Sequence, residues 1–231
     1  MLKVSEIFGP TIQGEGALMG QPTMFVRLGG CDYRCDWCDT LYAVLPNYNK
    51  EWKKATEEEV VDELEHSACS GAHADCEWVT VSGGNPALQD CEELIRQTQS
   101  KGFKVAMETQ GSICRAWFTE LDHLVLSPKP PSSGEQLDES VFRECLENAP
   151  YHYSIKLVVK DMDDYEWARG LVERHNLSDE QDVFLQPCNT NTLLNLDSYK
   201  WLVAQALDNP IYGTRILPQL HVLAWGGERG V

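Results

Sequence analysis

Apolar residues along this chain gather in short runs that are separated by longer segments with a helical pattern. The runs are nearly continuous rather than alternating, which is typical of strands buried on both faces of a parallel sheet. They predict six strands: Thr23–Leu28, Trp78–Ser82, Lys104–Glu108, His123–Ser127, Tyr153–Val159 and Asp182–Gln186.

The intervening segments have the 3.6-residue period of helices. They predict helices at Thr56–Glu65, Asp90–Ser100, Ser140–Asn148, Asp163–His175 and Ser198–Asp208. Thr56 and Glu59 have the spacing of a capping box at a helix start. A closed eightfold barrel typically needs about 250 residues, and the periodicity accommodates about six βα units. We therefore predict an α/β fold: a partial, open βα barrel of about six parallel strands with helices outside, forming one domain over residues 1–231.

Glycine-rich or polar segments follow five of the predicted strands. Active sites of barrel-type α/β folds form at the rim where the carboxyl ends of the strands meet. We therefore expect these segments to lie together around one site. They begin at Gly29, Ser82, Glu108, Ser127 and Gln186.

Composition and charge narrow the class of protein. The chain is 42% hydrophobic and 24% charged, as is ordinary for a globular protein. It has no apolar run of membrane-spanning length and no apolar secretory core at its start, so we expect a cytoplasmic protein without a membrane partner. The formal net charge of -17 repels phosphate backbones, so we expect no nucleic-acid partner.

Three of the nine cysteines, Cys31, Cys35 and Cys38, lie close together in one segment. Tightly spaced thiolates hold iron–sulfur clusters, and a four-iron, four-sulfur cluster normally takes four of them. Three would leave one iron open to a ligand from outside the protein. A structural zinc site needs four ligands, usually in two pairs, and no second pair is present. A non-enzymatic iron–sulfur or zinc module nevertheless stays an alternative.

The spacing C-x3-C-x-aromatic-C after a strand resembles the radical S-adenosylmethionine superfamily. The resemblance implies that the amino and carboxylate groups of S-adenosylmethionine chelate the open iron. Electron transfer then cleaves the sulfonium to a 5′-deoxyadenosyl radical. The segment Ser82–Pro86 is similar to the superfamily's GGEP motif, whose backbone, here Gly84, holds the methionyl amino group. Asn85 replaces the usual glutamate of that motif.

Further motifs resemble one family within it, the 7-carboxy-7-deazaguanine synthases. They are Glu6–Gly16, Phe25–Leu28, Cys38–Thr40, Glu108–Gly111, Ser127–Lys129 and the carboxyl tail. The resemblance implies a carbon–nitrogen lyase of queuosine biosynthesis, which contracts 6-carboxy-5,6,7,8-tetrahydropterin to 7-carboxy-7-deazaguanine with loss of ammonia. The cofactor radical carries the chemistry, so no side chain is expected to be catalytic in its own right. A radical activase for a glycyl-radical enzyme is the alternative that shares the cysteine motif.

The same resemblance implies the residues that bind the cofactors. Thr40 is similar to a position that ligates Mg²⁺, a hard ion that takes few protein ligands, although by residue type alone it is a cap or turn residue. The contacts implied for S-adenosylmethionine come from Trp37, Cys38, Asp39, Gly84, Ser127, Pro128, Lys129, Gln186, Pro187, Cys188 and Asn189.

The implied pterin site consists of Ile12, Gln13, Gly14, Glu15, Arg27, Ser82 and Val231. Gln13 and Glu15 would meet the aminopyrimidinone edge, and Gly14 would let the backbone approach a flat ring. Arg27, in an apolar strand, needs a partner: a substrate carboxylate or a buried ion pair. The terminal carboxylate of Val231 would reach the substrate.

Two further positions and two partners complete the expectations. Lys156 lies mid-strand, where its ammonium points into the barrel mouth or snorkels to solvent, the second being favoured. His221 aligns only loosely with a histidine of the family. The resemblance also implies a flavodoxin-like electron donor and a homodimer.

Overall fold

The computed structural model describes residues 1–69, 76–177, 182–189 and 195–230. Within them, one nine-stranded sheet has the order β3-β1-β2-β4-β5-β6-β7-β8-β9. The strands are β1 Leu2–Ile12, β2 Pro22–Leu28, β3 Lys53–Ala55, β4 Trp78–Gly83, β5 Lys104–Thr109, β6 His123–Leu126, β7 Tyr153–Val159, β8 Asp182–Pro187 and β9 Thr214–Ile216.

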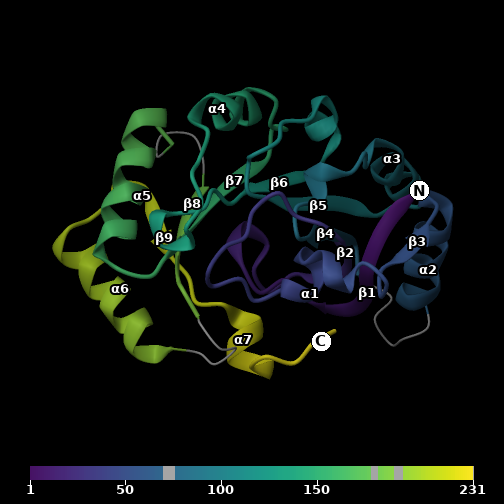
Figure 1. The fold of residues 1–231 in the computed structure, drawn as a ribbon, viewed down its shortest axis with the longest axis horizontal. Helices are drawn as coiled ribbons and strands as arrows, with labels where there is room; N and C mark the ends of the chain where they lie inside the picture. Colours follow the sequence, from purple (N-terminus) through teal and green to yellow (C-terminus); the bar gives the residue numbers. More distant parts are fainter. Residues whose placement is uncertain (70–75, 178–181, 190–194, 231) are drawn as a thin grey trace.

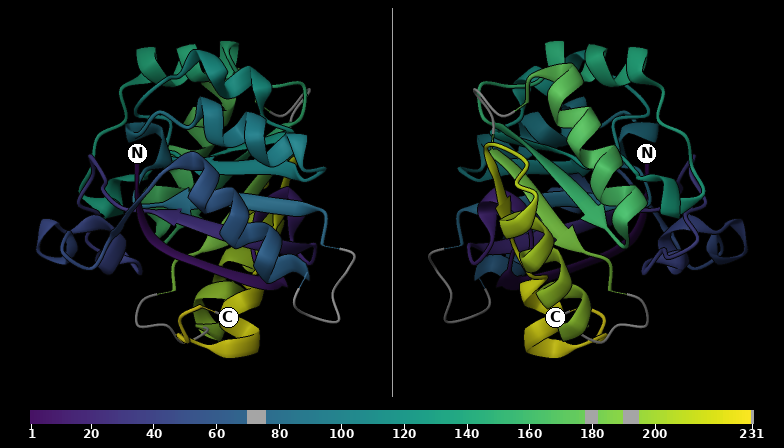
Figure 2. Two further views of the ribbon diagram at one scale, coloured as in Figure 1. Left: turned by 90° about the vertical axis from the view of Figure 1, so that its right-hand side faces the viewer. Right: turned by 90° about the vertical axis from the view of Figure 1, so that its left-hand side faces the viewer.

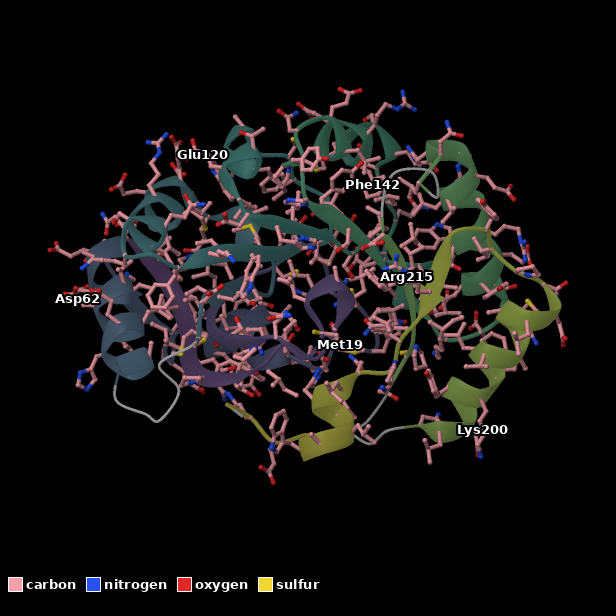
Figure 3. All side chains as sticks on the ribbon, turned by 180° about the vertical axis from the view of Figure 1, so that it is seen from behind. Met19, Asp62, Glu120, Phe142, Lys200 and Arg215 are labelled. Atoms are coloured by element: carbon pink, nitrogen blue, oxygen red, sulfur yellow. The ribbon has the colours of Figure 1, made fainter. Side chains whose placement is uncertain are left out.

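The helices are α1 Leu41–Val44, α2 Glu57–Cys69, α3 Glu92–Ser100, α4 Glu139–Glu147, α5 Met162–His175, α6 Leu196–Asp208 and α7 Leu220–Trp225. Helices α2 to α6 cover the outside of the curved sheet (Figure 1). Short 3-10 turns occur at Gly16–Leu18, Pro46–Tyr48, Pro86–Leu88, Ala116–Glu120 and Pro131–Ser133. Apolar side chains fill the layer between sheet and helices, where Phe142 of α4 is fully buried (Figure 3).

The sequence-based prediction of a parallel, open α/β barrel is confirmed. Each of the six predicted strands is present, as β2 and β4 to β8, with ends within about a residue of the predicted ones. The capping box is also present: the Thr56 N–H donates to Glu59 Oε2 at 2.8 Å, and the Glu59 N–H donates to Thr56 Oγ1 at 3.2 Å.

Three strands were not predicted. β1 pairs antiparallel with both β2 and β3, and β9 extends the parallel part of the sheet beyond β8. β1 contains Gly9-Pro10 and two register irregularities, so its sequence lacks a regular strand pattern. β3 begins at Lys53 and Lys54, which are polar and give no apolar run for a strand prediction.

Along a strand, side chains point alternately to the hydrophobic core and to the interior of the barrel. In β2, Val26 and Leu28 belong to the hydrophobic core, whereas Arg27 lines an interior cavity. In β7, Leu157 is a core residue and Lys156 faces the cavity. Since successive side chains of a strand point to opposite faces, Arg27 and Lys156 are directed inward, toward the cavity.

The sheet does not close on itself, because the two edge strands, β3 and β9, are not paired with each other. α7 and the segment after it lie across this open side, next to β1 (Figures 1 and 2). The N–H of Leu220 donates to the carbonyl of Gly14 at 2.9 Å, which joins α7 to the residues after β1. None of the helices in the described part of the chain has the length and apolar character of a bilayer span.

Candidate active site

A cavity of about 290 Å³ lies inside the barrel and collects most of the residues that the sequence singled out. Its wall includes Ile12, Gln13, Gly14, Glu15, Arg27, Cys31, Cys35, Trp37, Cys38, Asp39, Thr40, Ser82, Gly84, Lys129, Pro187, Cys188 and Asn189. Ser127, Pro128 and Gln186 are buried and do not line it. The predicted contact of Val231 lies outside the described residues.

The three clustered cysteines line this cavity together. Cys31 Sγ accepts hydrogen bonds from the Tyr33 N–H at 3.4 Å and from Gln110 Nε2 at 3.5 Å. Burial raises the pKa of the Cys31 thiol, and it raises the pKa of Cys35 to about 11 against the opposing effect of Lys129. Metal binding to such thiols releases their protons.

The donor chemistry of this wall fits an iron–sulfur cluster. Among the described residues, no three His, Cys, Asp or Glu side chains converge on one metal ion. An iron–sulfur cluster does not require its cysteines to converge on one ion, because each cysteine binds a different iron atom. Three thiols spread along one cavity wall, beside a glycine turn, can bind a cluster in this way.

The buried carboxylate of Asp164 supports the cysteine loop through Ser132 and Trp37. Trp37 Nε1 donates to Ser132 Oγ at 3.0 Å, and Ser132 Oγ donates to Asp164 Oδ2 at 2.6 Å. Asp164, fully buried at the start of α5, also accepts from the N–H groups of Ser132 and Lys160, each at 2.9 Å. The charge is therefore satisfied, and the relay fixes the orientation of Trp37. Neither Ser132 nor Asp164 was predicted as a site residue.

The Gly83–Gly84 turn after β4 packs directly against the cysteine loop. A Cβ on Gly84 would lie 2.2 Å from the carbonyl oxygen of Gly30, so only glycine fits there. The following Asn85 is buried, and its Nδ2 donates to Asp32 Oδ1 at 2.8 Å. A glutamate here would bring a second carboxylate next to Asp32, whereas the amide of Asn85 donates a hydrogen bond to it.

Lys156 lies at the centre of a buried charge cluster in the barrel. Its side chain is 5% exposed, and Nζ donates to carboxylates of both Glu15 and Glu108. The favoured interpretation that Lys156 snorkels to solvent is therefore wrong, because these two carboxylates satisfy its charge inside. Its pKa is raised: burial opposes this, but Glu108 and Glu15 outweigh it. Glu108 was recognised only as part of a motif, since its partner is distant in sequence.

Glu15 remains ionised in this environment. Burial raises its pKa, but the charges of Lys156 and His221 and the bonds from Lys156 and Gln219 outweigh burial and lower the pKa to about 2. His221 lies against Gly14, where a Cβ would come within 2.1 Å of the His221 Nδ1. The glycine therefore admits the imidazole ring of His221.

Arg27 has a protein partner, as the ion-pair interpretation predicted. Its Nε donates to Glu6 Oε1 at 2.7 Å, and its guanidinium lies 5.7 Å from the Phe8 ring centroid and 5.9 Å from that of Tyr42. Arg229, which was not predicted, bonds the other oxygen of Glu6 at 2.9 Å. The guanidinium of Arg27 still faces the cavity.

An open parallel barrel with three cysteines in one loop of its cavity defines an enzyme of the iron–sulfur, radical S-adenosylmethionine class. A family model described as a 4Fe-4S single cluster domain matches residues 12–125. The chain is 39% identical to the 7-carboxy-7-deazaguanine synthase of Bacillus cereus, covering 100% of this chain and 99% of that protein. It is 38% identical to the protein of that name from Bacillus subtilis, over 100% and 98%. It belongs to the 7-carboxy-7-deazaguanine synthase family.

A solved structure shows the same fold. QueE from Escherichia coli superposes with a TM-score of 0.73, at 24% identity over 95% of this chain and 94% of that one. Membership of the family favours a 7-carboxy-7-deazaguanine synthase over the glycyl-radical activase and over the non-enzymatic metal module.

Proposed function

We propose that this chain contracts 6-carboxy-5,6,7,8-tetrahydropterin to 7-carboxy-7-deazaguanine with loss of ammonia, in queuosine biosynthesis in the cytoplasm. The observation that carries this proposal is a single cavity that joins the three-cysteine loop to the buried charges of Glu15, Lys156 and Arg27. Residues 1–231 act as one domain in this reaction. An iron–sulfur cluster with S-adenosylmethionine supplies the hydrogen-abstracting chemistry when bound, and the protein binds, orients and shields the substrate.

The cysteine side of the cavity holds the cofactors. Cys31, Cys35 and Cys38 are the cluster ligands. The S-adenosylmethionine contacts come from Trp37, Asp39, Gly84, Lys129, Pro187, Cys188 and Asn189, which all line the same cavity. Ser127 acts through Lys129, whose Nζ donates to Ser127 Oγ at 3.0 Å. Pro128 and Gln186 are buried and adjoin the lining residues Lys129 and Pro187 in the chain.

The opposite side binds the pterin. The ionised Glu15 carboxylate is a suitable acceptor for the guanidine-like amino edge of a pterin, through charge-assisted hydrogen bonds. Lys156 keeps Glu15 in this charged form. Arg27 binds the substrate carboxylate, and Ile12, Gln13, Gly14, Ser82 and the terminal carboxylate of Val231 complete the site.

Thr40 is the proposed Mg²⁺ ligand. Its hydroxyl lies 3.7 Å from Cys38 Sγ, and Thr40 lines the same cavity. A threonine oxygen with substrate and water oxygens suits a hard cation that keeps most of its waters. The proposal further includes a homodimer and a flavodoxin-like protein as the electron donor.

Anaerobic turnover tests the function. The reconstituted protein is incubated with S-adenosylmethionine, dithionite and the carboxytetrahydropterin, with and without Mg²⁺, and products are identified by mass. We expect 7-carboxy-7-deazaguanine and ammonia in equal amounts, with more product when Mg²⁺ is present. Cleavage of S-adenosylmethionine that yields no deazaguanine, in the presence of this pterin, would overturn the assignment.

A further inference from the structure

Glu6 of β1 joins three distant parts of the chain at the edge of the cavity. Its Oε1 accepts from Arg27 Nε at 2.7 Å and from the Tyr42 hydroxyl at 2.9 Å, and its Oε2 accepts from Arg229 Nε at 2.9 Å. Burial raises the pKa of Glu6, but Arg27, Arg229 and Tyr42 outweigh it, so the pKa is lowered. Glu6 therefore stays a carboxylate that two arginines share.

The segment that carries Arg229 forms part of the cavity wall. Gly226 to Gly230 line the cavity from its open side. The guanidinium carbon of Arg229 lies 3.7 Å from the centroid of the Tyr42 ring, a close cation–π contact. Two interactions, one ionic and one aromatic, thus hold this terminal segment against β1 and α1.

The charges of this group do not cancel. Arg27 and Arg229 bring two positive charges and Glu6 one negative charge, so the trio has an excess of one positive charge. Glu51 also acts on Arg229, but it is exposed and its effect is screened by water.

The bond to Glu6 occupies Nε of Arg27, and a guanidinium has five N–H donors. Its terminal nitrogens can therefore bond a carboxylate in the cavity at the same time.

We propose that Arg229 determines specificity for a carboxylated pterin: by sharing Glu6 with Arg27, it leaves a net positive charge beside Arg27 that favours binding of the substrate carboxylate. Without Arg229, the charges of Glu6 and Arg27 cancel, so the pair attracts an anionic substrate group less strongly even though the terminal nitrogens of Arg27 remain available. This inference rests on the proposed function for the identity of the ligand. It assigns to the terminal segment a role in selecting the ligand, besides covering the cavity.

The test compares two fluorescent pterins that differ in the carboxylate. Binding of 6-carboxypterin and of unsubstituted pterin to the anaerobic, cofactor-loaded protein is measured by fluorescence titration. For Arg229→Gln we expect the Kd of 6-carboxypterin to rise about tenfold, which is about 1.4 kcal/mol. The Kd of unsubstituted pterin should change by less than about twofold, because it has no carboxylate to be selected. Arg229→Lys keeps the charge and should restore most of the selectivity.

Arg215→Gln is the matched control. Arg215 on β9 (Figure 3) also combines an ion pair, to Asp182 at 2.8 Å, with a ring contact, 5.7 Å from the Phe184 centroid. It does not line the cavity, so its removal should leave both Kd values unchanged. Iron content is measured in every variant to verify that the cluster site is intact.

Two results would overturn the inference. If Arg229→Gln weakens both pterins equally, Arg229 only anchors the terminal segment, and if it weakens neither, it has no role in binding. The proposed function fails in a different way: the unaltered protein would then bind 6-carboxypterin no more tightly than unsubstituted pterin.

Discussion

Replacing Lys156 by methionine tests the buried charge cluster at the centre of the barrel. Methionine fills nearly the same space but removes the ammonium that Glu15 and Glu108 share. Both carboxylates are largely shielded from water, with side chains 13% and 23% exposed. The variant therefore leaves two largely shielded carboxylates without the ammonium that both of them contact.

The pKa of Glu15 sets the size of the effect. It is lowered from 4.5 to about 2, and Lys156 is the largest of the groups that lower it. A shift of this size corresponds to about 3 kcal/mol, at about 1.4 kcal/mol for each pKa unit. His221 and Gln219 contribute part of it, so we expect Lys156→Met to lower the free energy of unfolding at pH 7.5 by about 2–3 kcal/mol.

The pH dependence of this loss has a definite sign. Because the pKa of Glu15 is lower in the folded protein, its stabilisation is complete above pH 4.5 and is lost as the pH falls from 4.5 toward 2. The unaltered protein therefore keeps it at pH 5. In the variant, burial without the ammonium raises the pKa of Glu15, so Glu15 takes up a proton more readily at pH 5. The difference in stability should thus be smaller at pH 5 than at pH 7.5.

Urea unfolding followed by tryptophan fluorescence measures both values, in anaerobic samples with matched iron content. Lys104→Met is the control, because Lys104 forms a solvent-exposed pair with Glu77 at 3.0 Å. Its loss should cost less than about 0.5 kcal/mol. Equal losses for Lys156→Met at both pH values, or none at pH 7.5, would refute the argument.

Three further predictions concern the cysteine side of the cavity. Cys38→Ala should abolish cluster absorbance and bound iron, whereas Cys91→Ala, at a buried position outside the cavity, should retain both; the reverse pattern would contradict the ligand assignment. Thr40→Ala should weaken the response of turnover to Mg²⁺ without changing iron content, and an unchanged Mg²⁺ titration would remove Thr40 from the metal site. Gly84→Ala should destabilise the protein by about 1–3 kcal/mol, because its Cβ would overlap the Gly30 carbonyl; a melting temperature equal to that of the unaltered protein would contradict this.

Much of the candidate site was predictable because it lies next to elements with strong local patterns. The cysteine loop follows β2, and the Gly83–Gly84 turn lies at the end of β4. Because the carboxyl ends of parallel strands meet at one rim, the sequence predicts that the loop and the turn lie together. The supporting residues were not predictable in this way. Asp164 lies in the first turn of α5 and, by sequence, is one of two acidic residues there. Only its burial and its hydrogen bond from Ser132 show that it holds Trp37 in place.

The sequence by itself determined the parallel strands, the helices between them and the three-cysteine loop, because each depends on burial and spacing over a few neighbouring residues. The tertiary structure decided which distant groups meet. Lys156 contacts Glu15 across 141 positions of the chain, and Arg229 contacts Glu6 across 223. Such contacts exist only once β1 has paired antiparallel with β2 and the terminal segment has crossed the open side of the barrel. Local periodicity does not encode those pairings, since they depend on how the whole sheet curves and where it stays open.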